Sequence, residues 1–600
     1  MADMMVKDLK RESFLACNWV YEQKEGEHYG YSSVQQCLRH SATEKTEEGE
    51  LEQSSMLSLL ERAASMMLEP ASINEPFLQY GTSRSATPND FTLDELNLFE
   101  SILYDIEEPW LTARLADILW LCKKPKRNIE HVKLAVESYI SHTITSDSWH
   151  RDVGKCWHRA ARLCLQIKDT NKLEEIKTNL YSALQSEYPD CVFMQLWLAE
   201  LLDELYIDED YLDDITAIIF CNADDLYLAK NFHAARSYFE LAAKKADQLG
   251  DTPTKIDSLI GVAICFVGEA ELLSLDSKMV ANTFYENAIQ AYRKIPKGCR
   301  EKYDINQRIS DVRAKLTETG QAALKEMSVV RTPGIDISPQ IKASVAHVSD
   351  KGNLNVALRY FIGLYSGVCY QTLESSAQES MQKNPLCTLF ASSHIASDGR
   401  VIGKTPGVNF NAGEKKLENM AVLKRQIQKQ VGFELQLVVQ GRLLPGLRQL
   451  LMEYSFTLPY LESLCHYSPF VPENRESLTA YALWLGFEYN FSNAIHLLCP
   501  QLENMVRVKL KESGANTSNL DLAGIENENG LSTLMDLSEA LDVFGENLVF
   551  EIKSIFTDSQ GSNLRNEVAH GLLDDQSSGG VSSVYAWWLI LRLILKSYGE

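Results

Sequence analysis

Two stretches in the middle of the chain indicate its fold: residues 235–242, ARSYFELA, and residues 281–288, ANTFYENA. Each stretch begins and ends with a small residue and carries a pair of aromatic residues between them. The small and aromatic positions recur at the three- and four-residue spacing that places them on one face of an α-helix. Both stretches are therefore predicted to be helices that pack through this face.

Helical patterns continue on both sides of these stretches. From about Glu108 to Leu316, apolar residues recur at three- and four-residue spacing, with short polar joints between the patterned segments. The two stretches resemble tetratricopeptide-like helix pairs, but they lie 46 residues apart, whereas that repeat has a period of roughly 34. We expect an irregular, partly tetratricopeptide-like helical array in an all-α protein, and such arrays usually present a concave surface to a partner.

The length predicts several domains, because 600 residues exceed what one hydrophobic core usually supports. A break is expected at Arg331-Thr332-Pro333-Gly334, with Pro339 close behind. The predicted domains are an N-terminal helical module at 1–107, the array at 108–330, a linker at 331–345, a second helical domain at 346–485 and a helical bundle at 486–600. One small β-hairpin is expected near 386–408, because Asp398-Gly399 separates two short apolar runs and favours a type I′ turn.

Composition and charge favour a soluble cytoplasmic protein. The formal net charge is −24, which opposes unspecific binding to nucleic acid or to anionic membranes. The thirteen cysteines include no C-x-x-C pair, which predicts reduced thiols and no zinc ribbon. The first fifteen residues lack an apolar leader, and the apolar run Val584–Leu595 is too short to span a membrane. We expect that run to be a buried helix, and we expect no metal, cofactor or membrane.

The residues with the most specific chemistry lie near the C-terminus. A turn at 558–563, DSQGSN, precedes the sequence LRNEVAHGL at 564–572. A cap by Ser562 or Asn563 would start a helix with Arg565 and Asn566 in its first turn, where the helix dipole favours an anion. Asn566 and His570 are four residues apart, about 40° around the helix axis. Arginine, amide and imidazole are therefore expected to converge on a phosphate-sized space.

This combination of side chains suits the cleavage of a phosphodiester without a metal. Histidine exchanges protons near neutral pH and can serve a ribose 2′-hydroxyl or the departing 5′-oxygen. Arginine can hold two non-bridging oxygens while negative charge develops on them. Because one histidine does not readily act as base and acid at once, two copies facing each other across a two-fold axis are expected.

The motif Gly561-x-Asn563-Leu564-Arg565-Asn566-x-x-Ala569-His570-Gly571-Leu572 resembles the signature of the HEPN superfamily, in the branch with an R-N-x-x-x-H-G motif. The upstream Pro500-x-x-Glu503-x-x-x-Arg507 also resembles that branch, and the likeness covers about 490–598. It implies a dimeric helical bundle that acts as a metal-independent endoribonuclease. Catalytic roles would fall to Arg565, His570 and Asn566, and Glu503, Arg507 and Asn563 would frame the site or an interface. Membership would also imply anti-phage defence or toxin activity, with the array sensing a protein or phage-derived trigger.

Other readings of the same sequence remain. The alternative function is a non-catalytic scaffold that dimerises and binds RNA or a nucleotide, with Arg565 and His570 binding the nucleotide or closing the interface. A purely structural interpretation would instead pair Arg565 with an acid and bury His570. Residues 491–600 carry seven basic and fifteen acidic residues, so bulk charge would not attract RNA to the bundle.

Residues 412–450 carry seven basic and three acidic residues, which fits a phosphate-facing strip or, more simply, a solvated helix face. A metal at His150, Cys156, His158 and Cys164 is not expected, because their spacing matches no structural zinc pattern.

Overall fold

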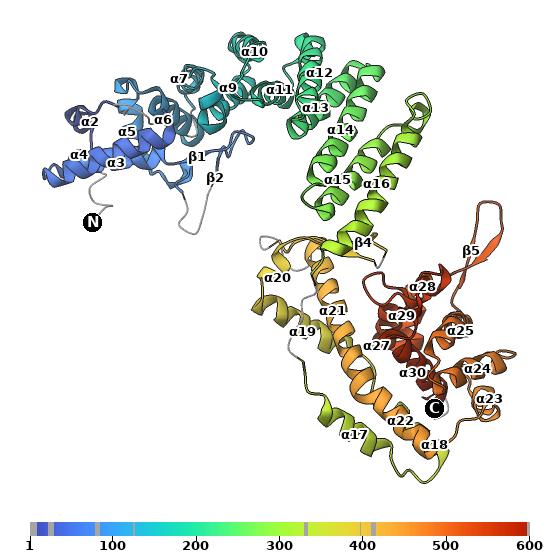
Figure 1. Cartoon of the computed structure of the whole chain (residues 1–600). Coiled ribbons are helices and arrows are strands. Elements are labelled where there is room, and N and C mark those ends of the chain that lie inside the picture. Colours follow the sequence, from blue (N-terminus) through green and yellow to red (C-terminus); the bar gives the residue numbers. More distant parts are fainter. Residues whose placement is uncertain are drawn as a thin grey trace. The chain divides into compact units, whose positions relative to one another are not determined.

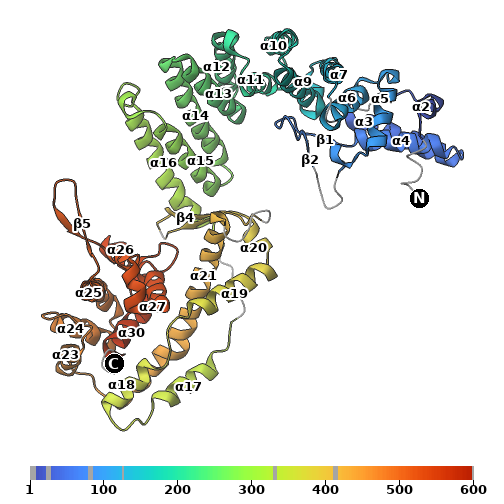
Figure 2. The same cartoon turned by 180° about the vertical axis from the view of Figure 1, so that it is seen from behind.

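The protein is mostly helical in the computed structural model shown in Figure 1 and, from behind, in Figure 2. The structure describes residues 9–21, 29–78, 85–123, 127–328, 334–396, 398–409 and 416–596. The chain divides into two compact units, Met1–Thr319 and Gly320–Glu600, called here the first and the second unit. The prediction of an all-α protein with minor β-hairpins is confirmed.

The described part of the first unit is a succession of helices with one small β-ladder. Its elements are α2 (Arg11–Cys17), α3 (Tyr31–Glu47), α4 (Leu51–Ala64), β1 (Met67–Leu68), β2 (Phe77–Leu78), η2 (Pro88–Asp90), α5 (Leu93–Ile102), η3 (Leu103–Asp105), α6 (Pro109–Cys122), α7 (Ile129–Ile140), α8 (Ser146–Ser148), η4 (Trp149–Val153), α9 (Gly154–Ile167), α10 (Thr170–Leu184), α11 (Met194–Glu204), η5 (Glu209–Tyr211), α12 (Leu212–Leu228), α13 (Phe232–Leu249), α14 (Thr252–Leu273), α15 (Lys278–Arg293), η6 (Lys297–Cys299) and α16 (Ile305–Glu326, whose end enters the second unit).

The two small-and-aromatic stretches, 235–242 and 281–288, lie on α13 and α15, and both helices pack against α14. Tyr238 and Phe239 of α13 are buried, as is Tyr285 of α15. Glycines on α14 allow the close contact with α13, because a Cβ atom at Gly261 would lie 2.6 Å from the ring of Phe239. Aromatic side chains thus rest on the bare backbone of the next helix, as the small and aromatic pattern predicts.

The second unit contains the elements that carry the C-terminal motif. They are α17 (Ser338–Val348), α18 (Leu354–Ile362), α19 (Tyr370–Lys383), α20 (Leu386–Leu389), β3 (Ser392–Ile395), β4 (Val401–Thr405), α21 (Leu417–Val438), η7 (Val439–Leu443), α22 (Leu444–Glu453), α23 (Leu458–Tyr467), α24 (Glu476–Phe487), α25 (Phe491–Glu512), β5 (Ser518–Leu520), β6 (Glu526–Glu528), α26 (Leu531–Met535), α27 (Ser538–Ile552), η8 (Lys553–Thr557), α28 (Leu564–Ala569), α29 (Asp575–Ser578) and α30 (Val581–Lys596).

The predicted β-hairpin is formed by β3 and β4, which pair antiparallel from Ser392 with Thr405 to Ile395 with Val401. The ladder shifts register after His394, and the loop is longer than the two-residue turn expected for Asp398-Gly399. The first residues of the predicted segment, Leu386–Leu389, are a helical turn instead. Two further hairpins, β1–β2 and β5–β6, are too short to show an alternating pattern in the sequence.

The core of the second unit surrounds α30. Trp587 and Trp588 are completely buried, and Trp587 Nε1 donates to the Leu483 carbonyl oxygen at 2.9 Å. Within the described part of the chain, Asp575–Lys596 is the one helical stretch long and apolar enough to cross a membrane, and 67% of its most apolar window is buried inside the protein. A core helix has the same composition, which agrees with the buried helix expected at Val584–Leu595.

The two segments predicted as separate domains, 346–485 and 486–600, share one hydrophobic core. The boundary between them falls inside α24, where Gly486 packs directly against the Trp587 indole ring. In the first unit, one core likewise continues across residues 107 and 108. Of the predicted linker, Arg331-Thr332-Pro333 lies outside the described residues, and α17 already begins at Ser338. The finer domain boundaries stay predictions.

Candidate functional site

The motif residues Arg565 and Asn566 occupy the first turn of α28, as the sequence predicts. The cap differs from the expected one. Asn563 is the N-cap residue, but its backbone is left-handed, with φ of 51°, and its side chain caps no helical N–H. Its carbonyl oxygen accepts from the backbone N–H groups of Asn566 and Glu567 instead. The predicted side-chain cap by Ser562 or Asn563 is therefore wrong, because a turn into the helix replaces it.

Gly571 ends the motif helix one residue after His570. Its φ of 65° lies in the left-handed region that favours glycine. The N–H of Leu572 donates to the Glu567 carbonyl at 2.8 Å, and the N–H of Gly571 donates to the Val568 carbonyl at 3.2 Å. This pair of bonds is a Schellman motif. The glycine of the motif thus places His570 at the exposed end of α28.

Gly561 serves a different purpose at the other end of the motif. A Cβ atom at this position would lie 2.1 Å from the Ser554 carbonyl oxygen. The same carbonyl accepts the N–H of Ser562 at 3.0 Å, so the loop before α28 lies directly on the end of η8. Because any larger residue would push this loop away, the glycine is required by close backbone contact.

Glu503 of α25 joins the two arginines that the sequence singled out. Its Oε2 accepts from Arg565 Nε at 2.8 Å, and its Oε1 accepts from Arg507 Nη2 at 2.8 Å. Burial on its own would raise the pKa of Glu503, but the hydrogen bonds from Arg565 and Arg507 lower it below its ordinary value. Glu503 is therefore a carboxylate held between two guanidinium groups.

Asn566 connects Arg565 to Asn563. Its Oδ1 accepts from Arg565 Nη1 at 3.2 Å, and its Nδ2 donates to Asn563 Oδ1 at 2.7 Å. Five of the six predicted site residues thus form one hydrogen-bonded chain, running through Arg507, Glu503, Arg565, Asn566 and Asn563. This chain fixes the guanidinium of Arg565, whose side chain stays 29% exposed.

His570 stands apart from this chain. Its backbone N–H donates to the Asn566 carbonyl oxygen at 3.0 Å, and the residue is exposed. No hydrogen bond or ion pair found between described residues joins its ring to Arg565 or Asn566. The alternative of a buried histidine is therefore wrong, whereas the alternative of an arginine paired to an acid is correct.

The basic strip predicted at 412–450 has a role that its sequence does not reveal. On α21, Gln428 Nε2 donates to Ser554 Oγ at 3.0 Å, and Arg425 Nη1 donates to the Gln560 carbonyl at 3.2 Å. Lys424 Nζ lies 2.9 Å from Asp558 Oδ2. These three side chains hold residues 554–560, the segment that leads into the motif. The contacts are long-range, so no local signal in the sequence could have identified them.

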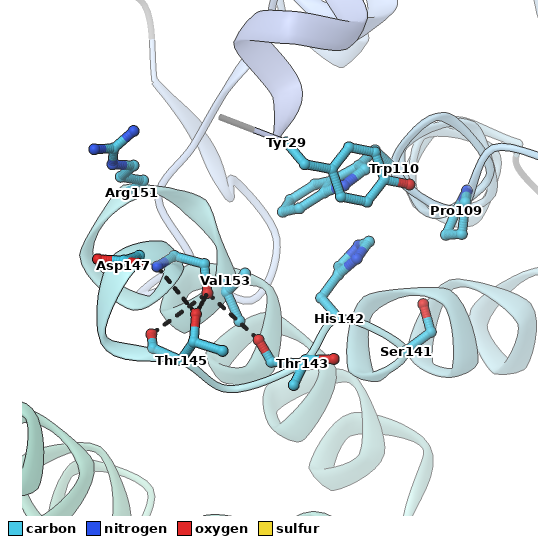
Figure 3. A pocket seen from close by; sticks show the side chains of 11 residues that line it. Tyr29, Pro109, Trp110, Ser141, His142, Thr143, Thr145, Asp147, Arg151 and Val153 are labelled. Atoms are coloured by element: carbon cyan, nitrogen blue, oxygen red, sulfur yellow. Dashed lines mark hydrogen bonds between the residues drawn. The ribbon is translucent and has the colours of Figure 1, made fainter. Parts of the chain in front are cut away.

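The first unit contains a separate aromatic pocket of about 320 Å³, shown in Figure 3. His142 stacks on Trp110 with ring centroids 3.7 Å apart, and Tyr29 meets both rings edge-on. The hydroxyl side chains of Thr143 and Thr145 line the same pocket. His142 Nε2 and Trp110 Nε1 are buried and have no hydrogen-bond partner among the described residues. Burial lowers the pKa of His142 to about 4, so the ring is neutral at physiological pH.

Within the described ranges, no group of three or more His, Cys, Asp or Glu side chains is arranged to hold a metal ion. Cys156 and Cys164 are buried, and burial raises the pKa of the Cys164 thiol to about 12, so it stays protonated.

Comparison with known proteins assigns part of the first unit. Residues 5–176 match the family model of a domain of unknown function, DUF7380. This range includes the residues that line the aromatic pocket. No curated protein and no solved structure matches the chain.

Proposed function

We propose that the second unit is a HEPN-type, metal-independent endoribonuclease. The observation that carries the proposal is the arrangement of the motif G-x-N-L-R-N-x-x-A-H-G-L. Its arginine is fixed by Glu503 and Asn566, and its histidine is solvent-exposed at the end of the same short helix. A fixed cation can stabilise the developing charge and an imidazole can transfer protons, and both contributions accelerate transesterification of RNA.

The chemistry assigns a role to each residue. The free edge of the Arg565 guanidinium binds the scissile phosphate and stabilises the charge that develops on its oxygens. His570 moves the proton, taking it from the 2′-hydroxyl or giving it to the 5′-oxygen. Asn566 orients the guanidinium, and Glu503, Arg507 and Asn563 frame it. Because each chain supplies one such histidine, we propose a homodimer whose two motifs share one cleft.

The remainder of the chain would control this activity. We propose that the helical array and the aromatic pocket of the first unit sense a protein or phage-derived trigger. The setting would be a cytoplasmic anti-phage or toxin system. This part rests on the resemblance to the HEPN superfamily.

A second function is favoured by one specific observation. Arg565 Nε is engaged by Glu503, which is how a purely structural arginine is held. The alternative is a scaffold that dimerises through the bundle and binds RNA or a nucleotide without cleaving it.

One experiment separates the two functions. Purified full-length protein is incubated with total RNA in the presence of EDTA, and the products are tested for 2′,3′-cyclic phosphate ends. The nuclease produces such ends, and the His570→Ala variant loses this cleavage. The control His496→Ala, which removes another exposed histidine of the same bundle, cleaves as well as the wild type. Bound but intact RNA would support the scaffold and contradict the nuclease.

A further inference from the structure

The second unit contains a cavity of about 850 Å³ that the proposed nuclease does not use. It lies between α25, α27, α30 and the segment 366–369. Apolar side chains make up much of its wall: Val368, Phe470, Phe544, Leu548 and Leu593. Pockets that bind small organic molecules commonly have volumes of roughly 300–1,000 Å³ and mostly apolar walls, and this cavity fits both criteria.

Two glycines with left-handed backbones shape the cavity. Gly545 interrupts α27 with φ of 74° and ψ of 157°, which bends the helix along the cavity wall. Gly367 has φ of 99°, and a Cβ atom there would lie 2.7 Å from Arg592 Nη1. The backbone thus approaches the Arg592 guanidinium more closely than any other residue would allow.

Arg592 lines the cavity, and among the residues that the structure describes its buried guanidinium has few hydrogen bonds and no close anion to compensate for its lost hydration. It is 7% exposed, and its Nη2 donates to the Ser366 carbonyl oxygen. Its Nε has no hydrogen-bond partner among the described residues. The nearest carboxylate, Glu551, lies 3.9 Å from Nη1, which is an ion pair without a hydrogen bond.

Glu551 is a weak counter-ion for this arginine. It is 2% exposed, and its Oε1 accepts the Tyr585 hydroxyl. Burial raises the pKa of Glu551, against the lowering effects of the Tyr585 hydroxyl and of Arg592. A buried guanidinium without a close anion is costly, and an anion placed in the cavity would relieve that cost.

We propose that this cavity binds an organic anion with an apolar body, whose carboxylate or phosphate pairs with Arg592. The apolar body packs on Phe470, Phe544 and Leu593. Lys509, which is paired with Glu512, and Lys596 also line the cavity, so that its wall contains three cationic residues and two acidic ones, Glu546 and Glu551. The site is independent of the motif at 561–572, and RNA cleavage is not needed to test it.

The test uses full-length protein and four probes: sodium octanoate, octyl phosphate, octanol and sodium acetate. Isothermal titration calorimetry is expected to show saturable one-to-one binding of octanoate or octyl phosphate, and comparison of the two identifies the preferred headgroup. Octanol, which lacks the charge, and acetate, which lacks the body, are expected to bind at least about tenfold more weakly. Equal binding of octanol and octanoate, or no binding of either anion, would overturn the proposal.

Two variants locate the site. Arg592→Gln removes the cation, and binding of the anion should be lost. Because this buried substitution can impair folding, Val543→Trp provides a second test, in which a large ring fills the cavity from a partly exposed position. Leu541→Trp, an exposed position on the same helix outside the cavity lining, is the matched control. Unchanged octanoate affinity in Val543→Trp would show that the anion binds elsewhere.

Discussion

Arg565 Nε donates a hydrogen bond to Glu503 Oε2 at 2.8 Å, which joins two helices whose contacting residues are 62 positions apart. The same carboxylate accepts from Arg507, so one acidic side chain orients two basic ones. The guanidinium at the proposed active site is thus held by α25 as well as by its own short helix. A six-residue helix alone would not fix a side chain so firmly, because isolated helices of this length are unstable.

Replacing Glu503 is expected to weaken both the fold and the site. In Glu503→Gln the charge between the two arginines is lost, and we expect a decrease of about 1–3 kcal/mol in the free energy of unfolding at pH 7. The folded state lowers the pKa of Glu503, so its contribution is present above the ordinary carboxyl pKa and is lost as the pH falls through the lowered value. Urea unfolding at pH 7 and below pH 4 measures both effects. If the stability difference between the wild type and Glu503→Gln were the same at both pH values, the charge of Glu503 would not be its source.

The two glycines of the motif are expected to respond differently to substitution. Gly571→Ala places a Cβ atom on a left-handed backbone with nothing else in its way, which should cost about 1–2 kcal/mol, and Gly571→Asn should cost less. Gly561→Ala should be more harmful, because its Cβ would lie 2.1 Å from the Ser554 carbonyl. Thermal unfolding of the three variants tests this order, and equal losses would show that close contact at Gly561 is not what matters.

The contacts from α21 are expected to position the motif. Gln428→Leu leaves Ser554 and Asp558 without the amide donor, and we predict a loss of about 1–2 kcal/mol in stability. Hydrogen exchange of the backbone between residues 558 and 566 should accelerate, because this segment loses an anchor. The exposed neighbour Lys429→Ala serves as the control. Unchanged exchange in Gln428→Leu would mean that α21 does not hold the loop.

The first unit is expected to lose stability in mild acid through His142. Burial lowers the pKa of this imidazole from about 6.5 to about 4, so the folded state favours the neutral ring. Its contribution is therefore present above the unfolded pKa and is lost as the pH falls from about 6.5 towards 4, by up to about 3 kcal/mol. His142→Phe keeps an aromatic ring on Trp110 and should flatten this pH dependence. A variant with the same acid sensitivity as the wild type would exclude His142 as its source.

The sequence predicted elements with strong local patterns. The apolar run at Val584–Leu595, expected to be a buried helix, lies within α30. Arg565 and Asn566 fall in the first turn of their helix, because a turn segment and a helical pattern meet there. The cap was mistaken, since side-chain caps and left-handed turns use the same residue types, Asn among them.

Long-range contacts account for what the sequence could not provide. Gln428 and Ser554 are 126 residues apart, and their hydrogen bond depends on how α21 packs. The cavity at Arg592 is likewise assembled from segments distant in sequence. Helical spacing predicts that the His570 ring lies near Arg565. His570 is the residue that follows the last residue of α28, so helical spacing alone does not fix its ring, and this proximity stays a prediction.

Chemical rescue of a histidine variant tests the central claim most directly. Full-length wild-type protein, His570→Ala and the control His496→Ala are incubated with RNA and EDTA, and the rate at which 2′,3′-cyclic phosphate ends appear is measured. We predict that His570→Ala is at least about 10²-fold slower than the wild type and that added imidazole restores part of the rate. If wild-type protein leaves RNA intact, or if His570→Ala cleaves as fast as His496→Ala, the second unit is not a nuclease of this kind.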